Sequence, residues 1–209
     1  MPRIIDLSQQ LTPSSLAYPG TQPIYQVKQL DIGDPDARVS RFTTFDLHGG
    51  THMDAPLHFD PQGTSIDEVA LQTIPLLVVE VEGQVVNQES VPRDCAGMAV
   101  LFSTGWHRHA GTANYYKGFP YISPDAARAL VAASVGLVGI DSPSVDGLES
   151  STYTTHKVLC GAGIPIVEGL VHLDRLRNLE GDIRFAAFPL ALQGLEASPV
   201  RAVAMLMDR

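Results

Sequence analysis

A short stretch in the first third of the chain holds the residues best suited to chemistry. Residues 48–58 read His-Gly-Gly-Thr-His-Met-Asp-Ala-Pro-Leu-His, so three histidines and one aspartate fall within eleven positions. Imidazole nitrogens and carboxylate oxygens are the ordinary ligands of zinc and similar divalent ions. A solvated histidine-rich turn is the alternative, but the density of the cluster favours a metal site.

The spacing of these residues fits an extended backbone better than a helix. In a helix, Asp54 would lie about 200° around the axis from His52, and Pro56 could not occupy the interior. In an extended segment, side chains two or four positions apart project to the same side. We therefore expect a strand that runs into a rigid loop and presents four side chains into one cavity: His48, His52, Asp54 and His58.

Two residues later in the chain are candidates for the same site. Glu168 lies in the otherwise apolar segment 164–170, where an unpaired buried carboxylate would be costly. His156 lies twelve residues earlier, at the start of a short predicted helix over 155–160. Taken singly, each could be a solvent-facing side chain. Because a ligand cluster already exists, we predict that a tight helix–turn–strand unit brings both to it.

The elements that position these residues follow from turn residues and apolar runs. Ser123 and Pro124 begin the clearest helix, since serine caps free amides and proline fits the first helical position, and the helix should run to about Ser134. Strands outnumber helices, so the predicted fold class is α/β or α+β with a mixed, β-rich sheet and few helices. The predicted strands are 25–32, 39–48, 76–86, 99–104, 135–141, 164–170, 184–191 and 200–206.

Length and composition restrict the class of protein. A chain of 209 residues with 44% hydrophobic content fits one domain over 1–209 with a sizeable core. The net charge of −9 and the lack of a basic stripe argue against a nucleic-acid partner. Cys95 and Cys160 are too few for a disulfide framework, and neither a signal peptide nor a membrane-spanning stretch is evident. We expect a cytoplasmic protein with no membrane partner.

The chain resembles the bacterial kynurenine formamidase and cyclase family of metal-dependent hydrolases. That family carries the motif H-x-G-T-H-x-D-x-P-x-H, which residues 48–58 match position by position, followed by a histidine and a glutamate that correspond to His156 and Glu168. The likeness covers nearly the whole chain. Further matching segments are Tyr18-Pro19-Gly20, Thr104-Gly105-Trp106 and residues 141–146.

This resemblance implies a swivelling β/β/α-type fold, assembled as a homodimer or larger homo-oligomer and holding one or two divalent ions, often zinc and sometimes manganese. It also implies an arylformamidase-like enzyme of tryptophan catabolism that acts on a small amide substrate. His58 would be the catalytic proton donor and acceptor. The implied metal ligands are His48, His52, Asp54, His156 and Glu168.

Such a site suits amide hydrolysis. Two divalent cations bring four positive charges; Asp54, Glu168 and a hydroxide offset three of them, which leaves a site that attracts a carbonyl oxygen and lowers the pKa of water. The hydroxide attacks the formamide carbon, and His58, with a reference pKa of about 6.5, protonates the leaving amine. If His58 is a structural histidine or a further ligand, this mechanism lacks its acid.

The substrate is less constrained than the chemistry. Formamidases of this kind carry a tryptophan before Pro-Gly in the N-terminal turn, where this chain has Tyr18, which could still stack on a substrate ring. N-Formylkynurenine is therefore the leading substrate, and isatin or another cyclic amide or lactone is the alternative. Further aromatic residues that could line a pocket, although a core position is the simpler interpretation, are Phe42, Phe45, Phe59 and Trp106.

Two other classes of function compete with a metal-dependent hydrolase. Cys160 lies four residues after His156 on the same predicted helix, so the two could form a nucleophilic dyad, but a buried core cysteine is the favoured interpretation. A non-enzymatic metal- or ligand-binding protein is the other class. Asp141 and Asp146 could orient ligands or simply cap turns, and His107 is expected on the surface.

Overall fold

The structure is a computed structural model that describes residues 3–12, 15, 24–31, 33 and 36–207. The helices are α1 (Pro124–Ala132) and α2 (Thr154–Gly161), with short 3-10 turns η1 (Pro56–His58), η2 (Ile66–Glu68), η3 (Gln88–Ser90), η4 (Trp106–His109) and η5 (Leu173–Leu176). The strands are β1 (Arg3–Asp6), β2 (Tyr25–Leu30), β3 (Val39–Phe45), β4 (His52–Asp54), β5 (Ile74–Glu80), β6 (Val85–Val86), β7 (Ala99–Ser103), β8 (Tyr121–Ile122), β9 (Leu137–Ile140), β10 (Ile166–Glu168), β11 (Ile183–Pro189) and β12 (Ala197–Leu206).

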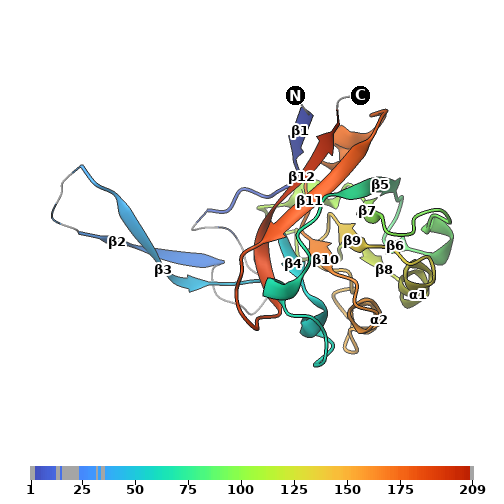
Figure 1. Ribbon diagram of the computed structural model, residues 1–209, viewed down its shortest axis with the longest axis horizontal. Helices are drawn as coiled ribbons and strands as arrows, with labels where there is room; N and C mark the ends of the chain where they lie inside the picture. Colours follow the sequence, from blue (N-terminus) through green and yellow to red (C-terminus); the bar gives the residue numbers. More distant parts are fainter. Residues whose placement is uncertain (1–2, 13–14, 16–23, 32, 34–35, 208–209) are drawn as a thin grey trace.

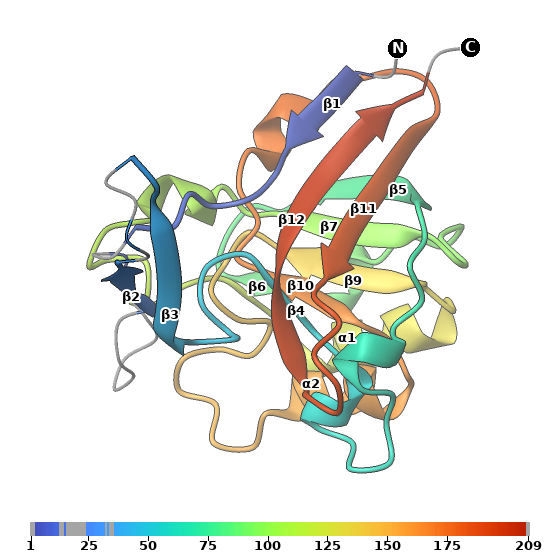
Figure 2. The same ribbon diagram turned by 60° about the vertical axis from the view of Figure 1, so that its left-hand side comes forward.

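Seven of the described strands close into a barrel-like mixed sheet (Figure 1). Their order is β12-β11-β5-β7-β9-β10-β4, and β4 pairs with β12 again to complete the ring, while β1 adds to the outer edge of β12. In Figure 2 the long arrows β11 and β12 cross in front of the shorter strands β7, β9 and β10. The predicted mixed, β-rich α/β class is confirmed.

The two faces of the central strands are both buried. On β7, Leu101 belongs to the core inside the barrel, whereas Phe102 belongs to a second core between the sheet and the helices. The same alternation places Val167 of β10 inside and Ile166 outside. Because β5, β7, β9 and β10 pair in parallel and are covered on both sides, they read in the sequence as continuous apolar runs.

Both helices begin close to where the sequence predicts. The Ser123 hydroxyl accepts a hydrogen bond from the Ala126 amide, as expected for an N-cap, and Pro124 fills the first position of α1. The helix ends at Ala132, two residues before the predicted Ser134, which has a left-handed backbone with φ of 55°. Among the described residues, no helix is both long and apolar enough to cross a membrane.

A two-stranded ribbon, β2–β3, projects away from the barrel (Figure 1). The predicted strand 39–48 is too long, because β3 ends at Phe45. The Asp46 side chain accepts a hydrogen bond from the His48 amide and its carbonyl accepts one from Gly49, which turns the chain back toward the barrel. The predicted strand 76–86 is likewise wrong in length, since Gly83, with φ of 94°, separates β5 from β6.

Candidate metal centre

Strands β4 and β10 supply three of the four deeply buried polar residues of the cluster, and His156 is the fourth. The strands are antiparallel, with Glu168 opposite His52 and Ile166 opposite Asp54. Met53 faces the interior of the barrel, so the side chains on either side of it in β4 face the opposite way, toward α2. His52, Asp54 and Glu168 are 2%, 1% and 4% exposed. Because these polar side chains are removed from water, each needs a partner that offsets the loss of solvation.

Helix α2 brings His156 to the same place. The His156 Nε2 atom lies 3.5 Å from Asp54 Oδ2 and 3.2 Å from Glu168 Oε1. Its other nitrogen, Nδ1, lies 2.7 Å from Asp146 Oδ2, and the Asp146 carboxylate also accepts hydrogen bonds from the Thr155 and His156 amides. The predicted helix–turn–strand unit therefore does bring His156 and Glu168 to the early cluster.

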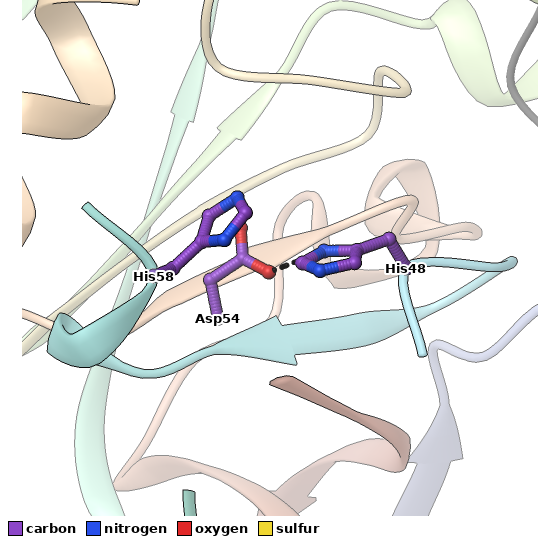
Figure 3. Close-up of side chains that lie close together, drawn as sticks. All are labelled: His48, Asp54 and His58. Carbon is purple, nitrogen blue, oxygen red and sulfur yellow. Dashed lines mark ion pairs between the residues drawn. The ribbon is translucent and has the colours of Figure 1, made fainter. Parts of the chain in front are cut away.

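His48 and His58 approach Asp54 from the turn before β4 and from η1 after it (Figure 3). The His48 Nδ1 atom lies 2.9 Å from Asp54 Oδ1. The His58 ring centre lies 4.5 Å from that of His48 and 5.5 Å from that of His156. Contrary to the sequence prediction, His48 lies on a turn and not at the end of strand 39–48, and His52 and Asp54 lie on a short strand of their own and not on a loop.

The arrangement of donor atoms fits a divalent cation. Both Asp54 oxygens are buried without a hydrogen bond from the described residues, although imidazole nitrogens surround them at 2.9 to 3.6 Å. His52 Nδ1 lies 3.1 Å from the Gly50 carbonyl oxygen, so its Nε2 atom is free to face the carboxylates. Neighbouring ligands of an ion with bonds of about 2.1 Å lie roughly 3 to 3.5 Å apart. The spacing around Asp54 matches that range.

The same atoms form two candidate ligand groups that share Asp54. One comprises His48, Asp54 and His58, and the other His52, Asp54 and Glu168; in each group the ligand atoms lie within 4.8 Å of one another. His156 Nε2 adjoins the second group through Glu168 Oε1. One or two ions are therefore compatible with this donor set, and His58 lies close enough to be either a ligand or a free base.

The centre keeps its carboxylates charged. Burial alone would raise the pKa of Asp54, but His52, His156 and His48 together hold it well below the ordinary value. Burial likewise works to raise the pKa of Glu168, and hydrogen bonds from His156 and His52 outweigh it. The two buried carboxylates therefore stay ionised and available to bind a cation.

The histidines respond to those carboxylates. Burial alone would lower the pKa of His48, yet its contact with Asp54 raises the pKa to about 9. For His58, which makes no such contact, burial prevails and the pKa lies below its ordinary value. His58 is therefore neutral near pH 7 and able to accept a proton.

The centre opens into a small cavity of about 130 Å³. Besides the ligand candidates and His58, its walls are aromatic or belong to the loop after β9, namely Phe59, Pro143, Ser144 and Tyr153. Phe59 stacks on the His156 ring at 4.8 Å between centres. Of the predicted aromatic residues, Phe59 thus lines the cavity, whereas Phe42 is 59% exposed on the β2–β3 ribbon.

The other residues singled out in the sequence lie in different surroundings. Tyr18, predicted to bind substrate, lies outside the described residues. Cys160 is buried in the core between sheet and helices, as favoured. Asp146 orients His156, but Asp141 instead accepts hydrogen bonds from Thr104 and lies 3.1 Å from His107 Nδ1. The His107 side chain, expected on the surface, is only 11% exposed.

Two residues near the centre have no counterpart in the sequence predictions. The Glu196 carboxylate lies 3.4 Å from His48 Nε2, the nitrogen that faces away from Asp54. Tyr153, the residue directly before α2, lines the cavity. Neither lies in a motif, and Glu196 meets His48 only through long-range packing, so the local pattern gives no signal for it. An aromatic residue at the start of a helix was the only hint for Tyr153.

Comparison with known families agrees with this geometry. The model of the Cyclase family matches residues 5–147. The chain belongs to that family. The match spans the early ligand motif and Asp146, whereas His156 and Glu168 follow it in the chain.

Several solved structures have the same fold as this chain. Isatin hydrolase A from Labrenzia aggregata, bound to benzyl benzoate, has a TM-score of 0.86 at 24% identity, with 99% of this chain and 94% of that chain covered. A structure described as a potential metal-dependent hydrolase with cyclase activity has a TM-score of 0.79 at 26% identity, with both chains fully covered. A predicted metal-dependent hydrolase from Bacillus stearothermophilus has a TM-score of 0.77 at 27% identity and covers 98% of each chain.

Proposed function

We propose that the protein is a metal-dependent hydrolase of aryl formamides, with N-formylkynurenine as the leading substrate. The observation that carries this proposal is the Asp54 carboxylate, whose two buried oxygens accept no hydrogen bond from the described residues while imidazole nitrogens surround it. A buried carboxylate in that condition is stabilised by a cation. Family membership and the relatives described as metal-dependent hydrolases support the same class of reaction.

The chain's own residues divide the work of binding and proton transfer. His48, His52, Asp54, His156 and Glu168 would hold one or two divalent ions, zinc being the leading candidate and manganese the alternative. A divalent cation bound there supplies a Lewis acid that polarises the substrate carbonyl and lowers the pKa of water. Asp54 and Glu168 stay ionised and balance its charge.

His58 supplies the proton movements of the reaction. Its ring lies beside those of His48 and His156 at the cavity wall, and burial keeps it neutral near pH 7. A neutral imidazole nitrogen takes a proton from the attacking water as the new carbon–oxygen bond forms. The same nitrogen gives that proton to the amine nitrogen as the carbon–nitrogen bond breaks, which releases formate and the aryl amine.

A cyclic aryl amide such as isatin is the second candidate substrate. Opening a lactam ring requires the same attack and the same proton transfer, except that the amine stays attached to the product. The fold is shared with isatin hydrolase A, and the cavity offers aromatic walls to either substrate. Relative turnover of N-formylkynurenine and isatin decides between the two substrates.

The test combines elemental analysis with turnover of N-formylkynurenine and isatin. We expect bound zinc or manganese, loss of activity after chelation and recovery on adding the metal back. His58→Ala should lose at least about 100-fold in kcat and retain the metal. If His58→Ala loses the metal as well, His58 is a ligand and the proton donor must be another group.

Thiol alkylation distinguishes the competing cysteine mechanism. Burial raises the pKa of Cys160 to about 12, so its thiol stays protonated and unreactive near neutral pH. Iodoacetamide should therefore leave the activity unchanged, as should Cys160→Ser if it folds. Turnover by a metal-free sample, or inactivation by alkylation alone, would contradict the proposal. Full metal occupancy without turnover of any amide would leave a metal-binding protein that is not an enzyme.

A further inference from the structure

Tyr153 has a backbone conformation that its side chain does not favour. It directly precedes α2, with φ of 48° and ψ of 46°, in the left-handed region. Only glycine, asparagine and aspartate adopt this region readily, and a bulky residue there is uncommon. Strained positions of this kind concentrate at functional sites, where the surrounding structure holds them in place.

The surrounding structure does hold this residue in place. The Tyr153 amide donates to the Ser150 hydroxyl at 3.2 Å, and the Tyr153 carbonyl accepts from the Lys157 amide at 3.1 Å. Two residues further on, Asp146 fixes the first turn of α2 through the Thr155 and His156 amides. The backbone at Tyr153 is therefore fixed by its own hydrogen bonds to Ser150 and Lys157, directly before the turn in which Asp146 orients His156.

Burial of the Tyr153 side chain does not explain the strained backbone. It is 46% exposed, and among the described residues none accepts or donates a hydrogen bond at its hydroxyl. Its ring packs on Phe59 at 5.5 Å, with 34° between the ring planes, and Phe59 packs in the same way on His156 at 4.8 Å. The three rings form an aromatic column that runs from the buried centre to the solvent.

The size of the cavity indicates what this column could contact. Pockets that enclose a whole small-molecule ligand usually measure about 300 to 1,000 Å³. The cavity at the centre measures about 130 Å³, which is enough for a formamide or lactam carbonyl but not for the ring attached to it. The ring of an aryl amide bound there would have to lie at the mouth, where Phe59 and Tyr153 form the wall.

We propose that Tyr153 is a specificity-determining residue, whose ring binds the aromatic ring of the substrate while the amide carbonyl enters the metal centre. This inference rests on the proposed function. It explains why tyrosine occupies a position where glycine or asparagine would be less strained. It also implies a preference for flat aromatic amides over aliphatic amides of the same length.

The experiment compares an aryl with an alkyl substrate. Formanilide and N-butylformamide are assayed with the wild type, Tyr153→Ala and Tyr153→Phe, all loaded with metal. We expect Tyr153→Ala to raise KM for formanilide about 3- to 10-fold, the range of one aromatic contact, with kcat nearly unchanged. N-Butylformamide should show no change in KM, and Tyr153→Phe should behave as the wild type with both substrates.

A matched control and a stability measurement complete the test. Phe188 is also about half exposed, at 50%, but lies on β11 and does not line the cavity, so Phe188→Ala should leave both KM values unchanged. Tyr153→Asn should raise the melting temperature by relieving the backbone, while it loses the preference for the aryl substrate. This readout does not depend on turnover.

The outcomes separate this inference from the proposed function. If the wild type hydrolyses formanilide and Tyr153→Ala leaves its KM unchanged, or raises KM equally for both substrates, the inference is wrong and the proposed function stands. If the wild type turns over neither formamide, N-formylkynurenine nor isatin, both are wrong. A loss of bound metal in Tyr153→Ala would show that Tyr153 supports α2 and not the substrate.

Discussion

At the scale of single residues, the centre depends on which nitrogen each imidazole presents to it. His156 turns Nδ1 to Asp146 and His52 turns Nδ1 to the Gly50 carbonyl, so both present Nε2 to the carboxylates. His48 has the opposite orientation, with Nδ1 on Asp54 and Nε2 facing Glu196. A hydrogen bond to one ring nitrogen fixes the tautomer and leaves the other nitrogen as the ligand.

Asp146 offers the clearest test of this arrangement. Asp146→Asn keeps the shape of the side chain but replaces a charged acceptor with an amide, so His156 loses its fixed tautomer and orientation. We expect the affinity for zinc, measured by calorimetry, to fall about 10- to 100-fold. Asp125→Asn, an exposed change on α1, is the control and should bind zinc as the wild type does. Unchanged affinity in Asp146→Asn would reduce Asp146 to a cap of α2.

At the scale of elements, the strand period predicted part of the centre and tertiary packing supplied the rest. Side chains two positions apart on a strand share a face, so spacing alone predicts that His52 and Asp54 lie together, as they do on β4. The same reasoning failed for His48, because hydrogen bonds to Asp46 end β3 and start a turn. Those bonds compete with the strand ladder in a way that hydrophobic alternation does not reveal.

The local sequence pattern does not predict which distant strands pair. The sequence identified β10 and β12 as strands, but not that the three-residue β4 pairs with both. That pairing sets which face of β4 meets α2 and so which side chains meet His156. The prediction of a core position for Phe42 is wrong for a similar reason. Its apolar character predicts burial, but Phe42 lies exposed on the β2–β3 ribbon, which projects from the barrel.

Gly169 tests how closely these elements must approach. It follows Glu168 with φ of 66°, and a Cβ atom on it would overlap the carbonyl oxygen of Gly50. Gly169→Ala should therefore lower the free energy of unfolding by about 2 to 5 kcal/mol, through backbone strain and overlap together. Zinc affinity should fall with it, because the turn before β4 and the end of β10 would move apart.

Gly161 provides the matched control for this substitution. It is the last residue of α2, and a Cβ atom added there meets nothing within 4 Å. Gly161→Ala should change the free energy of unfolding, measured in urea, by no more than about 1 kcal/mol. Equal effects of the two substitutions would contradict a tight contact between Gly169 and Gly50.

At the scale of the whole molecule, the centre lies where the barrel closes. β4 completes the ring by pairing with β10 on one side and β12 on the other, and the turn before it carries His48. At this seam, β4 from the first third of the chain meets β10 and β12 from its last quarter. A cation that binds the seam therefore binds the folded state alone and stabilises the whole barrel.

The stability of the metal-free protein and that of the zinc-loaded protein should respond differently to pH. Zinc at a free concentration of 100 times its Kd should raise the free energy of unfolding by about 2.7 kcal/mol. Without metal, contact with Asp54 raises the pKa of His48 to about 9, above the value of about 6.5 expected in the unfolded chain. The ion pair between His48 and Asp54 therefore makes its full contribution to the free energy of unfolding below about pH 6.5, and this contribution disappears as the pH rises through about 9.

The stabilisation by zinc has the opposite dependence on pH, because zinc competes with protons for the same imidazole nitrogens. In urea unfolding at about pH 6 and about pH 8, zinc should therefore raise the free energy of unfolding more at the higher pH. In the chelated protein, the His48–Asp54 ion pair should contribute less to the free energy of unfolding at the higher pH. His48→Ala should reduce this pH dependence, whereas His109→Ala, whose side chain does not line the cavity, should preserve it. A zinc-induced gain that is the same at both pH values would mean that these imidazoles neither bind the ion nor exchange protons with it, and the centre would then depend on its carboxylates alone.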